Sequence, residues 1–103
     1  MMAHTQPRSV FFITVNMACM DRLPDLLADW LPDGRLWGQE WVARNPTRAD
    51  RHAGSFKVNT QTGRWADFAT GDAGSDPVSL YAYLEGLKQG EAARALSDQW
   101  GPR

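Results

Sequence analysis

Residues 63–83 constrain the fold more than any other part of this chain. Residues 64–68 follow a turn and predict the returning strand of a hairpin. A tight glycine-containing loop follows at residues 71–75. Asp76 and Pro77 then predict a helix start, because aspartate caps free backbone N–H groups and proline suits the first helical position. A strand, a glycine turn and a capped helix in one short stretch predict a sheet with a helix packed close to it.

The remaining elements follow from hydrophobic periodicity and turn residues. The fold class predicted is α+β, with a small antiparallel sheet of three to four strands and flanking helices. Helices are expected at residues 21–31, 77–86 and 91–100, and strands at residues 40–44, 55–59 and 64–68. The β-branched and aromatic run at residues 10–15 predicts one further strand within an N-terminal extension, residues 1–20. Residues 21–103 then form a single module.

The cysteine and histidine content argues against a metal site or a disulfide. Among 103 residues there is one cysteine, Cys19, and the two histidines, His4 and His52, lie far from each other. This spacing matches no zinc motif, and a lone thiol forms no intramolecular disulfide. The longest apolar run is too short to span a bilayer, and no signal-peptide pattern is present. A cytoplasmic protein without a membrane partner is expected.

Charge is segregated along the chain although the net charge is only −1. Residues 34–66 carry six Lys and Arg against two acidic residues, whereas the segments on either side are acidic. A basic middle is a candidate surface for a polyanion. The alternative is a solvated face whose cations pair with the acidic flanks.

Four sequence elements occur together in an order that resembles a known family. They are Asn45-Pro-Thr-Arg48, Ser55-Phe-Lys-Val58, Phe68-Ala-Thr-Gly71 and Asp72-Ala-Gly-Ser-Asp76. The chain resembles the N-terminal zinc-binding domain of DNA primases, with the four metal-ligand positions occupied by Asn45, Arg48, Phe68 and Gly71. It is still more similar to the zinc-free version of this domain in primase/helicase proteins of phages and mobile elements.

The resemblance implies a zinc-ribbon-like sheet that has lost its metal and needs no cofactor. A structural zinc site supplies on the order of 10 kcal/mol to the folding of a small domain, so packing must take its place. Phe68 is therefore expected in the core, enclosed by Trp41 and Trp65. Asp67, Asp72 and Asp76 are interpreted as turn and cap residues rather than as a metal cluster. The glycine turn lacks the Gly-Lys-Ser/Thr of a P-loop.

The function expected is a non-catalytic module that binds template DNA, single-stranded, in the replication of a phage or mobile element. Trp37 is equally compatible with base stacking and with a place in the core. In an antiparallel sheet, Lys57 and Arg64 would share the solvent face and contact phosphates. The candidate binding residues are Arg44, Arg48, Arg51, His52, Lys57, Arg64 and Trp37.

Two alternatives stay open. In the first alternative, the chain is a small interaction protein that docks on a replication or host-defence nucleoprotein complex and inhibits it, using its acidic flanks. An enzyme is the least favoured reading, since no catalytic constellation is visible. The resemblance is compatible with a free-standing protein and with the N-terminal part of a primase/helicase.

Overall fold

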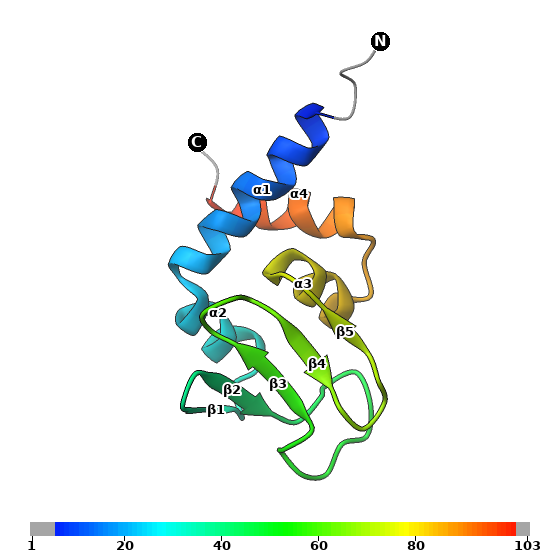
Figure 1. Ribbon diagram of the computed structural model, residues 1–103. Coiled ribbons are helices and arrows are strands. Elements are labelled where there is room, and N and C mark those ends of the chain that lie inside the picture. Colours follow the sequence, from blue (N-terminus) through cyan, green and yellow to red (C-terminus); the bar gives the residue numbers. More distant parts are fainter. Residues whose placement is uncertain (1–5, 101–103) are drawn as a thin grey trace.

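The computed structural model describes residues 6–100, and the side chains from Val10 onward. Within these residues the fold is α+β, as predicted, with helices stacked above a single sheet (Figure 1). The elements are α1 (Gln6–Asp21), α2 (Leu23–Trp30), β1 (Arg35–Trp37), β2 (Glu40–Ala43), β3 (Phe56–Asn59), β4 (Trp65–Asp67), β5 (Ala73–Gly74), α3 (Pro77–Glu85) and α4 (Gln89–Trp100).

The sheet is an antiparallel meander in which each strand pairs with the next along the chain. Trp41 on β2 lies opposite Val58 on β3, which in turn lies opposite Trp65 on β4. The strand count is five rather than the predicted three to four. The additional strands, β1 and β5, are the edges of the sheet and are only three and two residues long. Segments this short show no strand pattern in the sequence and look like loops.

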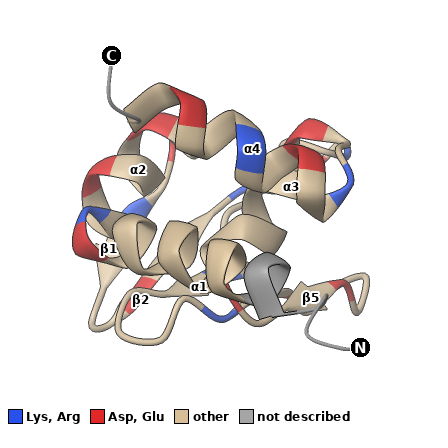
Figure 2. Cartoon of the chain, turned by 90° about the horizontal axis from the view of Figure 1, so that it is seen from above, with Lys and Arg blue, Asp and Glu red and all other residues tan. Residues whose placement is uncertain are grey.

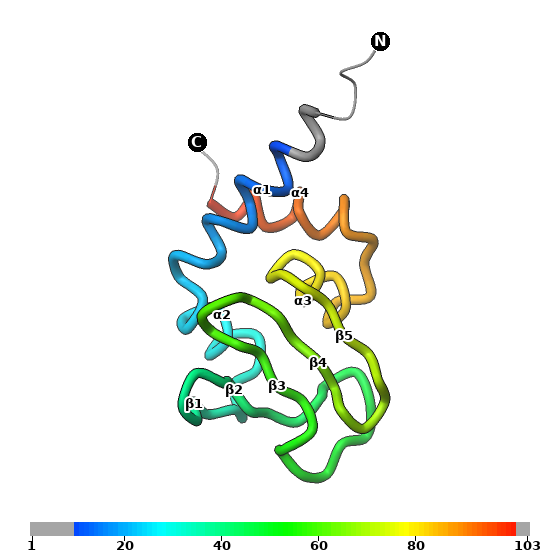
Figure 3. Tube along the Cα trace, in the orientation of Figure 1, coloured from blue at the N-terminus to red at the C-terminus, as the bar shows by residue number. Residues whose placement is uncertain are grey.

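Two hydrophobic clusters lie on either side of α3, and both include residues of α2. The first lies between the sheet and the helices α2 and α3 and contains Phe56, Val58, Trp65, Leu27 and Leu80. The second lies among α1, α3 and α4 with Leu26 of α2, and its members from α3 are Val78 and Ala82. The Cα trace in Figure 3 shows α3 between the sheet on one side and α1 with α4 on the other. Helix α3 is therefore the central layer of the molecule.

Residues 10–15 were expected to form a strand, and this prediction is wrong, because they belong to α1. Val15 and Cys19 are buried against α3 and α4, while Asn16 accepts a hydrogen bond from the Val78 N–H at 2.9 Å. Val10, Ile13 and Met17 project from the other side of the helix and are exposed. Apolar residues on both sides hide the helical period, and tertiary packing overrides the β propensity of the run.

Burial also determines the chemistry of the single thiol. It raises the pKa of Cys19 to about 12, so the thiol stays protonated at neutral pH. A buried, protonated thiol is a structural residue rather than a reactive one.

The helix predicted at residues 21–31 begins later than expected. Asp21 ends α1, and Arg22 is the N-cap of α2, without a side-chain cap hydrogen bond. Pro24 occupies the first turn of α2. None of the helices in the described part of the chain has the length and apolar character needed to cross a membrane.

The predicted start and end of α3 are confirmed. The Asp76 carboxylate accepts the Ser79 N–H at 2.8 Å, and the two residues form a reciprocal capping box ahead of Pro77. Gly86 ends the helix with a φ of 68°, in the left-handed region that favours glycine. Gly74 precedes the cap, and a Cβ there would collide with the Trp65 indole. The glycine turn thus lets β5 pass close to the core.

Candidate nucleic-acid interface

One face of the sheet packs on the helices and the other does not. Side chains alternate along each strand, so the face that carries Phe56, Val58 and Trp65 is covered by α2 and α3. In the view of Figure 1 no helix crosses in front of the strands. We call the uncovered side the open face; its residues are Arg35, Trp37, Glu40, Val42, Lys57, Asn59, Arg64, Ala66 and Phe68.

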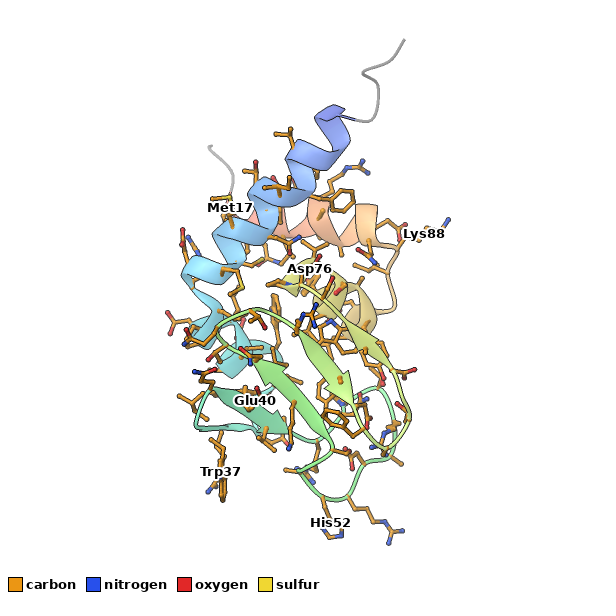
Figure 4. All side chains as sticks on the ribbon, in the orientation of Figure 1. Met17, Trp37, Glu40, His52, Asp76 and Lys88 are labelled. Carbon is orange, nitrogen blue, oxygen red and sulfur yellow. The ribbon has the colours of Figure 1, made fainter. Side chains whose placement is uncertain are left out.

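Two large aromatic side chains of the open face are exposed. Trp37 is 74% exposed and Phe68 is 72% exposed. Trp37 therefore lies outside the core, which rules out one of the two alternatives for this residue; base stacking stays a prediction. In Figure 4 its side chain points away from the body of the molecule. An exposed pair of large aromatics on one face is uncommon in a small domain and typical of a binding surface.

The prediction that Phe68 is buried is wrong. The side chain of the preceding residue, Asp67, is fully buried on the covered face, so alternation sends Phe68 to the open face. The Phe68 N–H donates to the Ser55 carbonyl at 2.8 Å, which keeps the strand pairing up to this residue. Trp65 is buried as expected, and Trp41 is half-buried with its indole N–H donating to the Leu31 carbonyl.

Two shallow hollows lie on the open face. One, of about 670 Å³, is lined by Lys57, Asn59, Arg64 and Phe68 among others. The second, of about 360 Å³, has Trp37 and Arg35 in its wall. Glu40 and Lys57 belong to both hollows, so these two residues stand between them. The hollows, together with the two aromatics, form a continuous surface across the sheet.

Three cations of the open face are not neutralised. The Lys57 ammonium lies 5.8 Å from the centre of the Phe68 ring, within the range of a cation–π contact. Arg35 and Arg64 are exposed. None of the three forms an ion pair with another residue in the described part of the chain. They are available to phosphates. Two carboxylates line the hollows of this face: Asp33 is paired with Arg44, whereas Glu40 forms no ion pair within the described residues.

Arg48, a predicted binding residue, instead forms an ion pair with the buried Asp67. Its Nε donates to Asp67 Oδ2 at 2.8 Å, and its Nη2 donates to Asp67 Oδ1 at 3.3 Å. Asn45 donates to the same Oδ2 at 2.9 Å and to the Tyr83 hydroxyl at 2.8 Å. We call Asn45, Arg48, Asp67 and Tyr83 the polar cluster. It ties the loop after β2 to the end of β4 and to α3.

The polar cluster stabilises a buried charge. The pKa of Asp67 lies well below its ordinary value of 3.8, chiefly because Arg48 hydrogen-bonds to the carboxylate, with further hydrogen bonds from Asn45 and the Ala69 N–H. Two positions that the primase resemblance aligns with metal ligands, Asn45 and Arg48, thus meet at one carboxylate. A third, Gly71, donates its N–H to the Asp67 carbonyl at 2.8 Å. Hydrogen bonds to Asp67, not the packing of Phe68, therefore stabilise the region around the polar cluster.

Of the remaining predicted residues, Arg44 lies at the margin of the open face in an ion pair, and Arg51 and His52 lie outside it. Arg44 Nε donates to Asp33 at 2.8 Å, and this hydrogen bond lowers the pKa of Asp33. Arg51 and His52 are exposed on the loop between β2 and β3, and Figure 4 shows His52 at the tip of that loop, apart from Trp37. Of the predicted set, Trp37, Lys57 and Arg64 come together on one surface.

Sequence reasoning missed Phe68, Arg35 and Glu40 as surface residues. The signal for Phe68 was present: Trp65 and Asp67 alternate with Arg64, Ala66 and Phe68, so a buried Trp65 places Phe68 on the other face. Arg35 carried no signal, because β1 is recognisable only once its pairing with β2 is known.

The acidic residues of the 67–76 segment have structural roles. Asp76 caps α3, and Asp72 accepts a hydrogen bond from the Tyr83 hydroxyl at 2.8 Å. Within the described residues no group of His, Cys, Asp and Glu side chains is arranged to hold a metal ion.

Comparison with known proteins adds no relative. Neither a scan against models of protein families nor a search of curated proteins finds a match to this chain. The resemblance to primase zinc-binding domains therefore stays a prediction from the motifs.

Proposed function

We propose that this protein is a non-catalytic module that binds single-stranded nucleic acid across the open face of its sheet. The observation that carries the proposal is the exposure of Trp37 and Phe68 on one face with Lys57 between the hollows beside them. Bases of a single strand stack on exposed aromatic rings, while nearby cations follow the phosphates. Sheet surfaces with exposed aromatics bind RNA single strands in the same manner.

Single strands fit this surface better than duplexes. Stacking on an aromatic ring requires a base face that is free of its neighbours, and a duplex hides both faces of each base. With three strand spacings of about 4.8 Å between β1 and β4, the two aromatics lie more than about 14 Å apart, room for several nucleotides. The primase resemblance supports template DNA of a phage or mobile element as the ligand, and we expect such a module to act in the cytoplasm.

The test is a titration of the pure protein against labelled single- and double-stranded DNA at low and moderate salt. We expect the single strand to bind more tightly and its affinity to fall as salt rises, because phosphate contacts release counterions. Trp37→Ala and Phe68→Ala should each weaken binding about tenfold, the value of one stacked base. Leu36→Ala is the matched control, since Leu36 is 56% exposed but lies outside the open face.

A second candidate function is docking on a replication or host-defence nucleoprotein complex. The observation that favours it is the exposed apolar side of α1, where Val10, Ile13 and Met17 are all more than half exposed. Between Val10 and Met20 this helix carries no charged residue (Figure 2). If no single strand binds at low salt, or if Trp37→Ala and Phe68→Ala leave the affinity unchanged, docking on a protein complex replaces the first proposal.

A further inference from the structure

A carboxylate lies in the middle of the proposed binding surface. Glu40 on β2 is opposite Asn59 on β3 and, in the other direction, opposite Trp37 on β1. It is half-buried and lines both hollows of the open face. A negative charge at this place repels the phosphates that Arg35, Lys57 and Arg64 would attract. Glu40 therefore needs a role other than binding the phosphate backbone of a nucleic acid.

The Glu40 carboxylate is fixed in orientation and retains acceptor capacity. Asn59 Nδ2 donates to Glu40 Oε2 at 2.9 Å. Asn59 cannot turn away, because its Oδ1 accepts the N–H groups of Gln61 and Thr62 at 2.8 and 3.0 Å. A carboxylate accepts about four hydrogen bonds, and this is the one that the side chain of Glu40 receives in the described part of the chain. The second oxygen, Oε1, is left for a donor from outside.

We infer that Glu40 selects bases that carry an exocyclic amino group, with cytosine preferred over thymine. The inference rests on the proposed function and names the class of single strand that the open face takes. The amino group at N4 of cytosine donates to a carboxylate. Thymine presents a carbonyl oxygen at the corresponding position, and this oxygen repels the carboxylate. Stacking beside Trp37 brings the edge of a base to Glu40, since the two residues are paired across β1 and β2.

The experiment compares oligo-dC and oligo-dT of about 12 nucleotides by fluorescence anisotropy. Both bases are pyrimidines that differ at position 4, and oligo-dU, which lacks the C5 methyl group of thymine, is measured beside oligo-dT to separate the effect of that methyl group. The pH is slightly alkaline to keep cytosine uncharged. We expect the wild-type protein to bind oligo-dC about tenfold more tightly than oligo-dT, the effect of one charge-assisted hydrogen bond. This ratio tests the inference without any variant.

Glu40→Gln should abolish the preference by strengthening the binding of oligo-dT. The new amide donates to O4 of thymine, and the repulsion of phosphates disappears. Glu85→Gln is the matched control, because Glu85 is an exposed carboxylate at the end of α3 and its removal changes the net charge equally. It should leave the ratio unchanged.

The outcomes separate the two proposals. Equal wild-type affinities for oligo-dC and oligo-dT, both weakened by Phe68→Ala, would overturn the selection by Glu40 and leave the proposed function standing. A preference for oligo-dC that survives in a folded Glu40→Gln protein would also overturn it. Binding to neither oligonucleotide would overturn the proposed function itself.

Discussion

At the scale of single residues, two phenylalanines show how position decides role. Phe56 is fully buried under α2 and α3, whereas Phe68 is 72% exposed on the opposite face of the same sheet. Both lie next to the polar cluster in sequence or in space, and both belong to segments that resemble primase motifs. Only one of them contributes apolar burial to the fold.

This difference predicts opposite consequences of one substitution. Phe56→Ala should lower the free energy of unfolding by about 3–5 kcal/mol, because it removes a buried ring and leaves a cavity. Phe68→Ala should change it by less than about 0.5 kcal/mol, as for other exposed positions. Urea unfolding followed by tryptophan fluorescence measures both. Equal losses for the two variants would mean that Phe68 packs in the core after all.

Asp67 is the residue whose charge the fold depends on most. Asp67→Asn keeps the shape of the side chain but removes the charge that Arg48 and Asn45 hydrogen-bond. We expect a loss of about 2–3 kcal/mol in the free energy of unfolding. Asp33→Asn is the matched control: the Asp33–Arg44 pair is exposed, and its loss should cost less than about 1 kcal/mol.

Comparing the wild-type protein with Asp67→Asn also gives a prediction about pH. The folded-state pKa of Asp67 is depressed, so its contribution is complete above the ordinary value of 3.8 and is lost as pH falls through the lower folded value. The difference in unfolding free energy between wild type and Asp67→Asn should be constant near neutral pH and shrink below about pH 4. A difference that grows on acidification would contradict this account.

At the scale of elements, the sequence predicted the parts whose signals are local. The strands β2, β3 and β4 and the helices α3 and α4 were each predicted within about two residues, and α3 carries its own cap residues. Helix α1 was misread because its apolar side chains lie on two sides. The edge strands β1 and β5 were not predictable, because pairing with a neighbour defines them.

The candidate site was predictable only in part for the same reason. The basic middle of the chain contains Lys57 and Arg64 of the open face, but which of its cations are free depends on long-range pairs such as Arg48–Asp67 and Arg44–Asp33. Those pairs join residues 19 and 11 positions apart in the sequence. No local pattern separates a paired arginine from a free one.

Helix α3 gives a prediction at this scale, since it is packed on both sides. Its capping box holds the N-terminus where β5 enters the helix. Asp76→Ala should therefore cost about 1 kcal/mol of unfolding free energy. Asp25→Ala, in the first turn of α2 where no side chain caps the helix, should cost less than about 0.5 kcal/mol. Thermal unfolding compares the two, and equal costs would show that the capping box contributes nothing specific.

At the scale of the whole molecule, charge is divided between layers. Figure 2 shows acidic residues gathered on α2, on the last turn of α4 and where α3 meets α4. The free cations Arg35, Lys57 and Arg64 lie on the open face of the sheet. A molecule charged in this way meets a polyanion with the open face leading and the helical layers turned away.

This division predicts how salt affects binding. Each phosphate contact contributes about 0.7 to the slope of the logarithm of affinity against the logarithm of salt concentration for a single strand. Lys57→Gln and Arg64→Gln should each weaken binding and reduce the slope by about 0.7. Lys88→Gln is the matched control, since Figure 4 shows Lys88 on the helical side, distant from Trp37. A slope that falls equally in the control would assign the salt effect to net charge alone.

The central claim is that the open face receives the single strand, and NMR of the ¹⁵N-labelled protein tests it most directly. On addition of single-stranded DNA, we expect the indole N–H signal of Trp37 and the backbone amides around Lys57 and Phe68 to shift. The indole of Trp65, which donates to Ser79 at 3.0 Å inside the fold, should stay in place. Shifts confined to α1 or to the acidic helices, with the Trp37 signal unmoved, would contradict the account.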